Sequence, residues 1–147
     1  MNRMMFLSLQ ADLSYIRVAS TVAGQVAAMF ADQVGASGNI DEFCHAFELS
    51  VSESFTNSVH YGGPSSHARS ITVEFSADDD HLTVMVTDNN EPFDPCPPAP
   101  EISSFPEKGY GLFIIRRLMD TVSYSRIDGK NILTMSKQVL KRVPGIQ

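Results

Sequence analysis

The stretch "FELSVSESFTNSVHYGG", residues 47–63, contains the pattern that decides the fold and also points to a site. Its apolar side chains recur every four residues, at Phe47, Val51, Phe55 and Val59. This spacing predicts a helix from Ile40 to about Tyr61, with one apolar ridge toward a core. Polar residues of the same segment fall on the opposite side: Ser50, Glu53, Asn57 and His60.

Glu53 and Asn57 are four residues apart, so on a helix their side chains lie within roughly 6 Å and can reach one object together. A carboxylate can accept a proton or hold an attacking hydroxyl group. An amide oxygen is a hard ligand that suits Mg2+, which usually binds together with substrate phosphates. This pair alone leaves two interpretations open, a solvated polar face and the wall of a site.

An earlier helix and a hairpin are predicted on either side of this segment. Asp12 or Ser14 is placed to cap the first helix. Its apolar residues recur at steps of three and four before Gly35: Leu13, Ile16, Ala19, Ala23, Val26 and Phe30. Downstream, "SITVEFSA" and "HLTVMVTD" alternate with a period of two about the acidic turn 78–80, which predicts a hairpin. Its core-facing residues are Ile71, Val73, Phe75, Leu82, Val84 and Val86.

Asp88 ends the second of these strands. An acidic side chain at the edge of a sheet can accept a hydrogen bond from the amino group of a purine. Aspartate at a strand end also serves turn formation, and this alternative stays open.

The segment after Asp88 changes character. Residues 92–106 contain six prolines, which exclude a helix or a central strand and predict a long loop of the kind that forms lids. A glycine turn, Gly109 to Gly111, then opens a helix with apolar residues at Leu112, Ile115, Met119 and Val122. Backbone N–H groups at such a helix start can face phosphate oxygens, with Lys108 beside them. A second hairpin is predicted about Asp128 and Gly129.

Helices and antiparallel strands therefore come in blocks, which favours an α+β fold. We expect a two-layer α/β sandwich, with a mixed, mostly antiparallel sheet and helices on one face. The length of 147 residues fits one domain over 1–147. A net charge of -6 argues against direct nucleic-acid binding, and the absence of an apolar run long enough to span a bilayer predicts a cytoplasmic protein without a membrane segment. The histidines form no zinc-binding pair.

Three motifs in one order carry a resemblance to a known family. "SESFTNSVHYG" is similar to an N-box, "VTDNNEPFDP" to a first glycine box, and "GYGLFIIRRLMDTVSY" to a second glycine box. The chain resembles, over nearly its whole length, the anti-sigma factor serine/threonine kinases of bacteria. These belong to the histidine-kinase-like ATPase superfamily, which has the Bergerat ATP-binding fold.

The resemblance implies a set of roles. Glu53 is the general base that activates the hydroxyl of a protein substrate, Asn57 coordinates Mg2+, and Asp88 binds the amino group of adenine. The proline-rich segment, at about 92–108, becomes the nucleotide lid. Phe93 packs below the nucleotide loop. The phosphates of ATP lie against the second glycine box and its flanks, which comprise Lys108, Gly109, Tyr110, Gly111 and Leu112.

Two positions qualify the resemblance. The family commonly has glycine two residues after the adenine-binding aspartate, where this chain has Asn90 among its nucleotide-binding residues. Asparagine tolerates a left-handed backbone better than most residues, so the turn is expected to survive. Arg17, away from the apolar ridge of the first helix, matches a position that contacts the sigma factor in the family.

The resemblance implies an ATP-dependent protein kinase that doubles as an anti-sigma factor. It would phosphorylate an anti-anti-sigma factor, bind a sigma factor and act as a homodimer, with ATP and Mg2+ as cofactors. The alternative is a non-catalytic, nucleotide-sensing switch that binds protein partners. A sensor histidine kinase is disfavoured because no phosphoacceptor helix domain fits before residue 40, and a DNA-dependent ATPase would need further domains.

Overall fold

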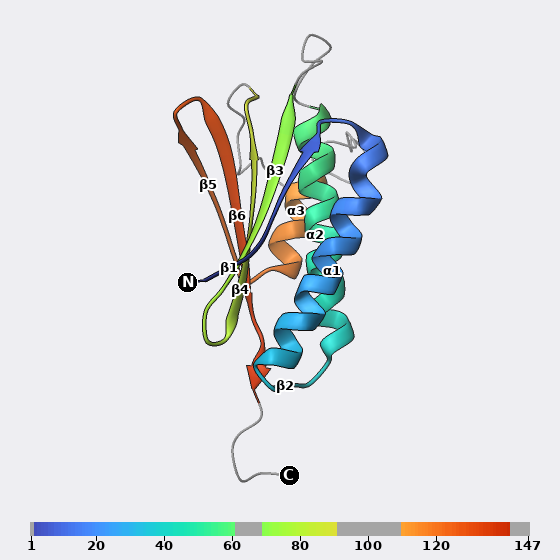
Figure 1. Cartoon of the computed structure of the whole chain (residues 1–147), viewed down its shortest axis with the longest axis vertical. Coiled ribbons are helices and arrows are strands. Elements are labelled where there is room, and N and C mark those ends of the chain that lie inside the picture. Colours follow the sequence, from blue (N-terminus) through green and yellow to red (C-terminus); the bar gives the residue numbers. More distant parts are fainter. Residues whose placement is uncertain (1, 61–68, 91–109, 142–147) are drawn as a thin grey trace.

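Two layers make up the fold, a five-stranded antiparallel sheet and a layer of helices packed on one of its faces (Figure 1). The computed structural model describes residues 2–60, 69–90 and 110–141. The elements in chain order are β1 Asn2–Gln10, a 3-10 turn Leu13–Tyr15, α1 Ile16–Gln33, β2 Ala36–Ser37, α2 Ile40–His60, β3 Ser70–Ala77, β4 His81–Asp88, α3 Tyr110–Leu118, β5 Thr121–Ile127, β6 Lys130–Gln138 and β7 Leu140–Lys141. The expected two-layer α+β architecture is confirmed.

The sheet has the order β1-β3-β4-β6-β5, and each pair of neighbouring strands in the described residues is antiparallel. β2 and β7 form a separate two-stranded ribbon. Both predicted hairpins are present, β3–β4 and β5–β6. The alternating residues of β3 and β4 are buried under the helices, as their period of two predicts: Ile71, Val73, Phe75, Leu82, Val84 and Val86.

The position of α2 corrects one detail of the sequence interpretation. The sequence pattern predicts Ser50 on the side opposite the apolar ridge, yet Ser50 is completely buried, and Ser54 and Ser58, one and two turns later, are buried too. The reason is that α2 packs between α1 and α3 as well as over the sheet (Figure 1). Small hydroxyl side chains on a second buried face let neighbouring elements approach closely, so the helix is more enclosed than its apolar ridge indicates.

The helix after the glycine turn is shorter than its apolar spacing predicts. α3 ends at Leu118, and Val122 lies in β5 instead of on the helix. The backbone N–H of Asp120 donates to the carbonyl of Ser136 at 2.9 Å, so the chain has already joined the sheet at that point. Met119 remains in the core. Among the described residues, no helix is both long and apolar enough to cross a membrane.

The β5–β6 turn provides a stability test. Asp128 and Gly129 have φ values of 53° and 77°, in the left-handed region. A Cβ on Gly129 would meet no atom within 4 Å, so Gly129→Ala adds backbone strain without a clash. We expect it to lower the free energy of unfolding by about 1 kcal/mol in urea titrations. Asp128→Asn, which tolerates this backbone, is the control and should change stability by less than about 0.5 kcal/mol.

Candidate functional site

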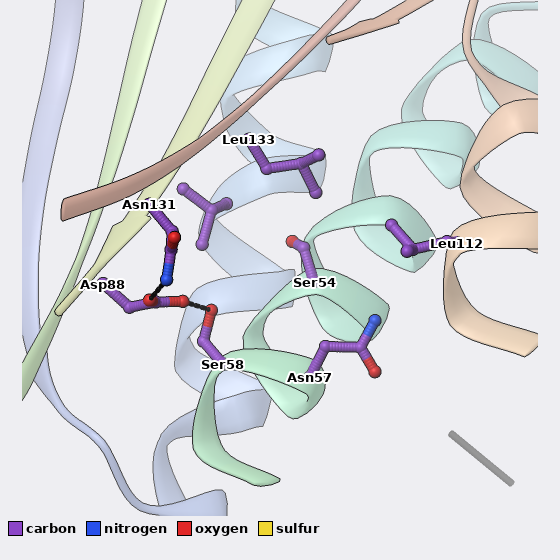
Figure 2. Close-up of a pocket in the computed structure, with 8 residues that line it drawn as sticks. Ser54, Asn57, Ser58, Asp88, Leu112, Asn131 and Leu133 are labelled. Atoms are coloured by element: carbon purple, nitrogen blue, oxygen red, sulfur yellow. Dashed lines mark hydrogen bonds between the residues drawn. The ribbon is translucent and has the colours of Figure 1, made fainter. Parts of the chain in front are cut away.

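A narrow cleft opens between α2, the end of β4, the start of α3 and β6 (Figure 2). Its lining residues are Ser54, Asn57, Ser58, Val86, Asp88, Leu112, Asn131 and Leu133. The cleft thus brings together three positions that the sequence singled out on separate elements, Asn57, Asp88 and Leu112. Its free volume is about 10 Å3, which is room for about one water molecule.

Asp88 forms the floor of the cleft and is only 4% exposed. Its Oδ2 accepts a hydrogen bond from the Ser58 hydroxyl at 2.7 Å. Its Oδ1 accepts from the Asn131 Nδ2 at 2.9 Å and from the Asn90 backbone N–H at 3.0 Å. These donors replace the water that a buried carboxylate loses, and they hold its orientation.

Glu53 and Asn57 face the first turn of α3. A Cβ built on Gly111 would lie 2.8 Å from the Asn57 Nδ2 and 3.1 Å from the Glu53 Oε2, so only glycine fits there without displacing them. The start of α3 therefore lies directly against the polar stripe of α2. Partial burial raises the pKa of the Glu53 carboxyl above its ordinary value, and a raised pKa suits a group that must accept a proton near neutral pH.

The side chain of Asn90 links two elements at the edge of the cleft. Among the described residues other than glycine, only Asp128 has a positive φ, so Asn90 does not adopt a left-handed backbone. Its buried side chain instead joins the end of β4 to the end of α2: the Nδ2 donates to the Ser58 carbonyl at 2.7 Å, and the Oδ1 accepts from Arg69. Arg69 also donates to the carbonyls of Ser58 and Val59.

The remaining predicted site residues do not line the cleft or lie outside the described residues. Phe93, Lys108 and Gly109, with the expected lid at about 92–108, lie outside the described residues. Tyr110 is the first residue of α3. Arg17 is exposed near the start of α1, which packs on the side of α2 away from α3 (Figure 1). His60 is exposed at the end of α2.

Two side chains that contact Asp88 were not predicted from the sequence. They are Ser58 and Asn131. Ser58 lies within the quoted stretch, four residues after Ser54, but its burial follows from the packing of α3 and the sheet around α2. Asn131 is opposite Asp88 in the β4–β6 register. That neighbour relation depends on the pairing of non-consecutive strands, and periodicity within each strand carries no information about it.

A second group of potential ligands lies at the β3–β4 turn, away from the cleft. Ligand atoms of Asp78, Asp80 and His81 lie within 4.8 Å of one another. Turn hydrogen bonds account for this arrangement, since the Asp78 Oδ1 accepts from the backbone of His81 and the Asp80 Oδ1 contacts the His81 Nδ1 at 2.6 Å. The group is a capped turn.

The raised pKa of Glu53 predicts a pH dependence of stability. The folded-state pKa of Glu53 exceeds the ordinary value of 4.5. The protonated carboxyl therefore contributes its full share of folding stability below pH 4.5, and this share is lost as pH rises through the folded-state pKa. Glu53→Gln removes the ionisation. We expect the variant to gain stability over the wild type at about pH 7 and to lose that gain by about pH 4 in urea titrations. A difference that is constant with pH would contradict the assignment.

Two curated relatives are similar to this chain over most of its length. Serine-protein kinase RsbW of Oceanobacillus iheyensis is 32% identical over 101 residues, which cover 63% of each chain. RsbW of Listeria innocua is 33% identical over 101 residues, 63% of this chain and 64% of that one. The aligned region thus spans less than two thirds of the length of these relatives.

A solved structure and a family model extend the comparison. The crystal structure of the RsbU and RsbW domains of a Mycobacterium tuberculosis protein has a TM-score of 0.60 and 17% identity; the superposition covers 95% of this chain and 35% of that one. This similarity supports the fold. The family model of the histidine kinase-like ATPase domain matches residues 9–137. A match over most of the chain, together with the architecture of the sheet and helices, shows that this protein belongs to the histidine kinase-like ATPase domain family.

Proposed function

We propose that this protein is an ATP-dependent protein serine/threonine kinase that acts as an anti-sigma factor in a partner-switching system. The observation that carries the proposal is the convergence of Asp88, Asn57 and Leu112 on one cleft, with Gly111 and Glu53 beside Asn57. The kinase names of the relatives support it. The proposed setting is the cytoplasm, where sigma factors act.

The residues of the cleft fit an adenine nucleotide with Mg2+. In the proposal, Asp88 accepts a hydrogen bond from the adenine amino group, and the oxygen donors of Asn57 and Glu53 face the metal and the phosphates. The first turn of α3, at Gly111, presents backbone N–H groups to phosphate oxygens. ATP supplies the phosphoryl group, and Mg2+ neutralises its charge. Glu53 would accept the proton of the attacking serine or threonine hydroxyl, whose oxygen would bond to the γ-phosphorus as ADP leaves.

In the proposal, the cleft widens when a nucleotide enters. Between the lining side chains there is room for about one water molecule. Leu112 on α3 and Leu133 on β6 border this space on either side (Figure 2). In the proposal, the adenine base lies between these two side chains.

The partners of the proposed switch are an anti-anti-sigma factor as substrate and a sigma factor held in alternation, with the protein acting as a homodimer. The exposed Arg17 on α1 is the proposed contact for the sigma factor. The narrow cleft also favours a second candidate function, a switch that binds protein partners without catalysis. Phosphotransfer measurements distinguish the two.

The direct test is incubation of the protein with Mg-ATP and the anti-anti-sigma-like proteins encoded beside its gene. We expect phosphoserine or phosphothreonine on one of them, detected by mass spectrometry. Glu53→Gln should slow transfer by about 100-fold or more while ATP affinity is retained. Glu48→Gln is the matched control, because Glu48 is on the same helix but contacts Gly24 of α1, and it should transfer at the wild-type rate. ATP binding without transfer to any candidate would reject the kinase in favour of the non-catalytic switch.

Gly111→Ala tests the contact between α3 and α2. The added Cβ would displace Asn57 and Glu53, whose atoms lie 2.8 and 3.1 Å from it. We expect ATP affinity in calorimetric titrations to fall by about tenfold or more. Gly35→Ala, between α1 and β2, is the control for a general loss of stability, because Gly35 has a φ of 67° and a Cβ there would meet no atom within 4 Å; it should bind ATP as the wild type does. Equal affinities for wild type and Gly111→Ala would contradict this placement of the nucleotide.

A further inference from the structure

We infer that Ser58 and Asn131 are positioning residues that set the base selectivity of the site by aiming the Asp88 carboxylate at an exocyclic amino group. This inference rests on the proposed binding of an adenine nucleotide, and it concerns two residues outside the motifs that suggested that function. Both line the cleft and both are buried, Ser58 at 6% and Asn131 at 1% exposure.

The Asp88 carboxylate has one hydrogen-bond acceptor position left for a ligand. An ionised carboxylate offers about four lone-pair sites, two on each oxygen. On Oδ1 both are used, by the Asn131 Nδ2 and the Asn90 N–H. On Oδ2 one is used, by the Ser58 hydroxyl. Within the described part of the chain, one acceptor position on Oδ2 therefore has no donor, and it lies beside the cleft.

Asn131 is itself held in one orientation. Its two amide hydrogens go to the Asp88 Oδ1 and to the Asn90 carbonyl, each at 2.9 Å. Its Oδ1 accepts from the Tyr124 hydroxyl at 2.6 Å and from Arg126 at 2.8 Å. A flipped amide would place N–H groups against these two donors, so Asn131 can present only its donor side to Asp88. Tyr124 and Arg126 on β5 thus fix an amide that fixes the carboxylate.

Ser58 acts from the opposite layer. Its hydroxyl donates to Oδ2, and its backbone carbonyl accepts from Asn90 and Arg69. Figure 2 shows Asp88 between Ser58 of α2 and Asn131 of β6. Donors on both sides keep the carboxylate from rotating. A base with an amino group at this position is favoured, whereas a base with a carbonyl there places two acceptors against each other.

The experiment compares ATP with two analogues, purine riboside triphosphate, which lacks the amino group, and inosine triphosphate, which has a carbonyl in its place. All three carry the same ribose and phosphates, so the ratio of their dissociation constants isolates the contact at the base. We expect the wild type to bind ATP at least tenfold more tightly than either analogue. In Ser58→Ala and Asn131→Leu, the affinity for ATP should fall by about tenfold, while the affinities for the two analogues should stay as in the wild type.

Thr134→Val on β6 is the matched control, since Thr134 lies three residues after Asn131 on the face of the sheet away from the helices. In this variant the ratio of the dissociation constants for ATP and the analogues should equal that of the wild type. Ser58→Ala alone carries the test if Asn131→Leu fails to fold by circular dichroism. Equal weakening of ATP and both analogues, or no weakening of any, would overturn the positioning role while leaving the proposed function intact. Failure of the wild type to bind ATP would overturn the proposed function itself, and this inference with it.

Discussion

The burial of the Asp88 carboxylate is the constraint on which the rest of the structure depends. A charged group removed from water is strongly unfavourable unless donors replace the solvent. Here the donors come from α2, from β6 and from the backbone just after β4. Satisfying this one carboxylate therefore fixes the end of α2 relative to two strands of the sheet. Asn90 and Arg69 reinforce the same junction through the last carbonyls of α2.

The enclosed position of α2 explains how a small fold can build a site. Phe47, Val51 and Phe55 fill the core on one side of the helix. The other sides remain available for Ser54 and Ser58 toward the sheet, and for Glu53 and Asn57 toward α3. Gly111 lets the first turn of α3 approach those two side chains. One helix thus contributes both to the hydrophobic core and to the polar wall of the cleft.

Periodicity predicts much of this architecture, because it depends only on neighbours within one element. The segment at Phe47 predicts a helix from Ile40, where α2 begins, and alternation predicts the buried face of the β3–β4 hairpin. The burial of Ser50 depends on which helices flank α2. The place of Val122 in a strand depends on where the chain joins the sheet after α3. Asn131 meets Asp88 through the pairing of β4 with β6. These features are set by tertiary contacts that no local pattern records.

The central claim is that the polar side chains of α2, β4, α3 and β6 form one nucleotide-binding cleft. It is tested most directly by following backbone amide signals by nuclear magnetic resonance during titration with ATP and Mg2+. The account predicts saturable shifts at Asn57, Asp88, Leu112 and Asn131, with Leu140 in the remote β2–β7 ribbon unchanged. An absence of saturable shifts, or shifts confined to residues away from this cleft, would contradict it.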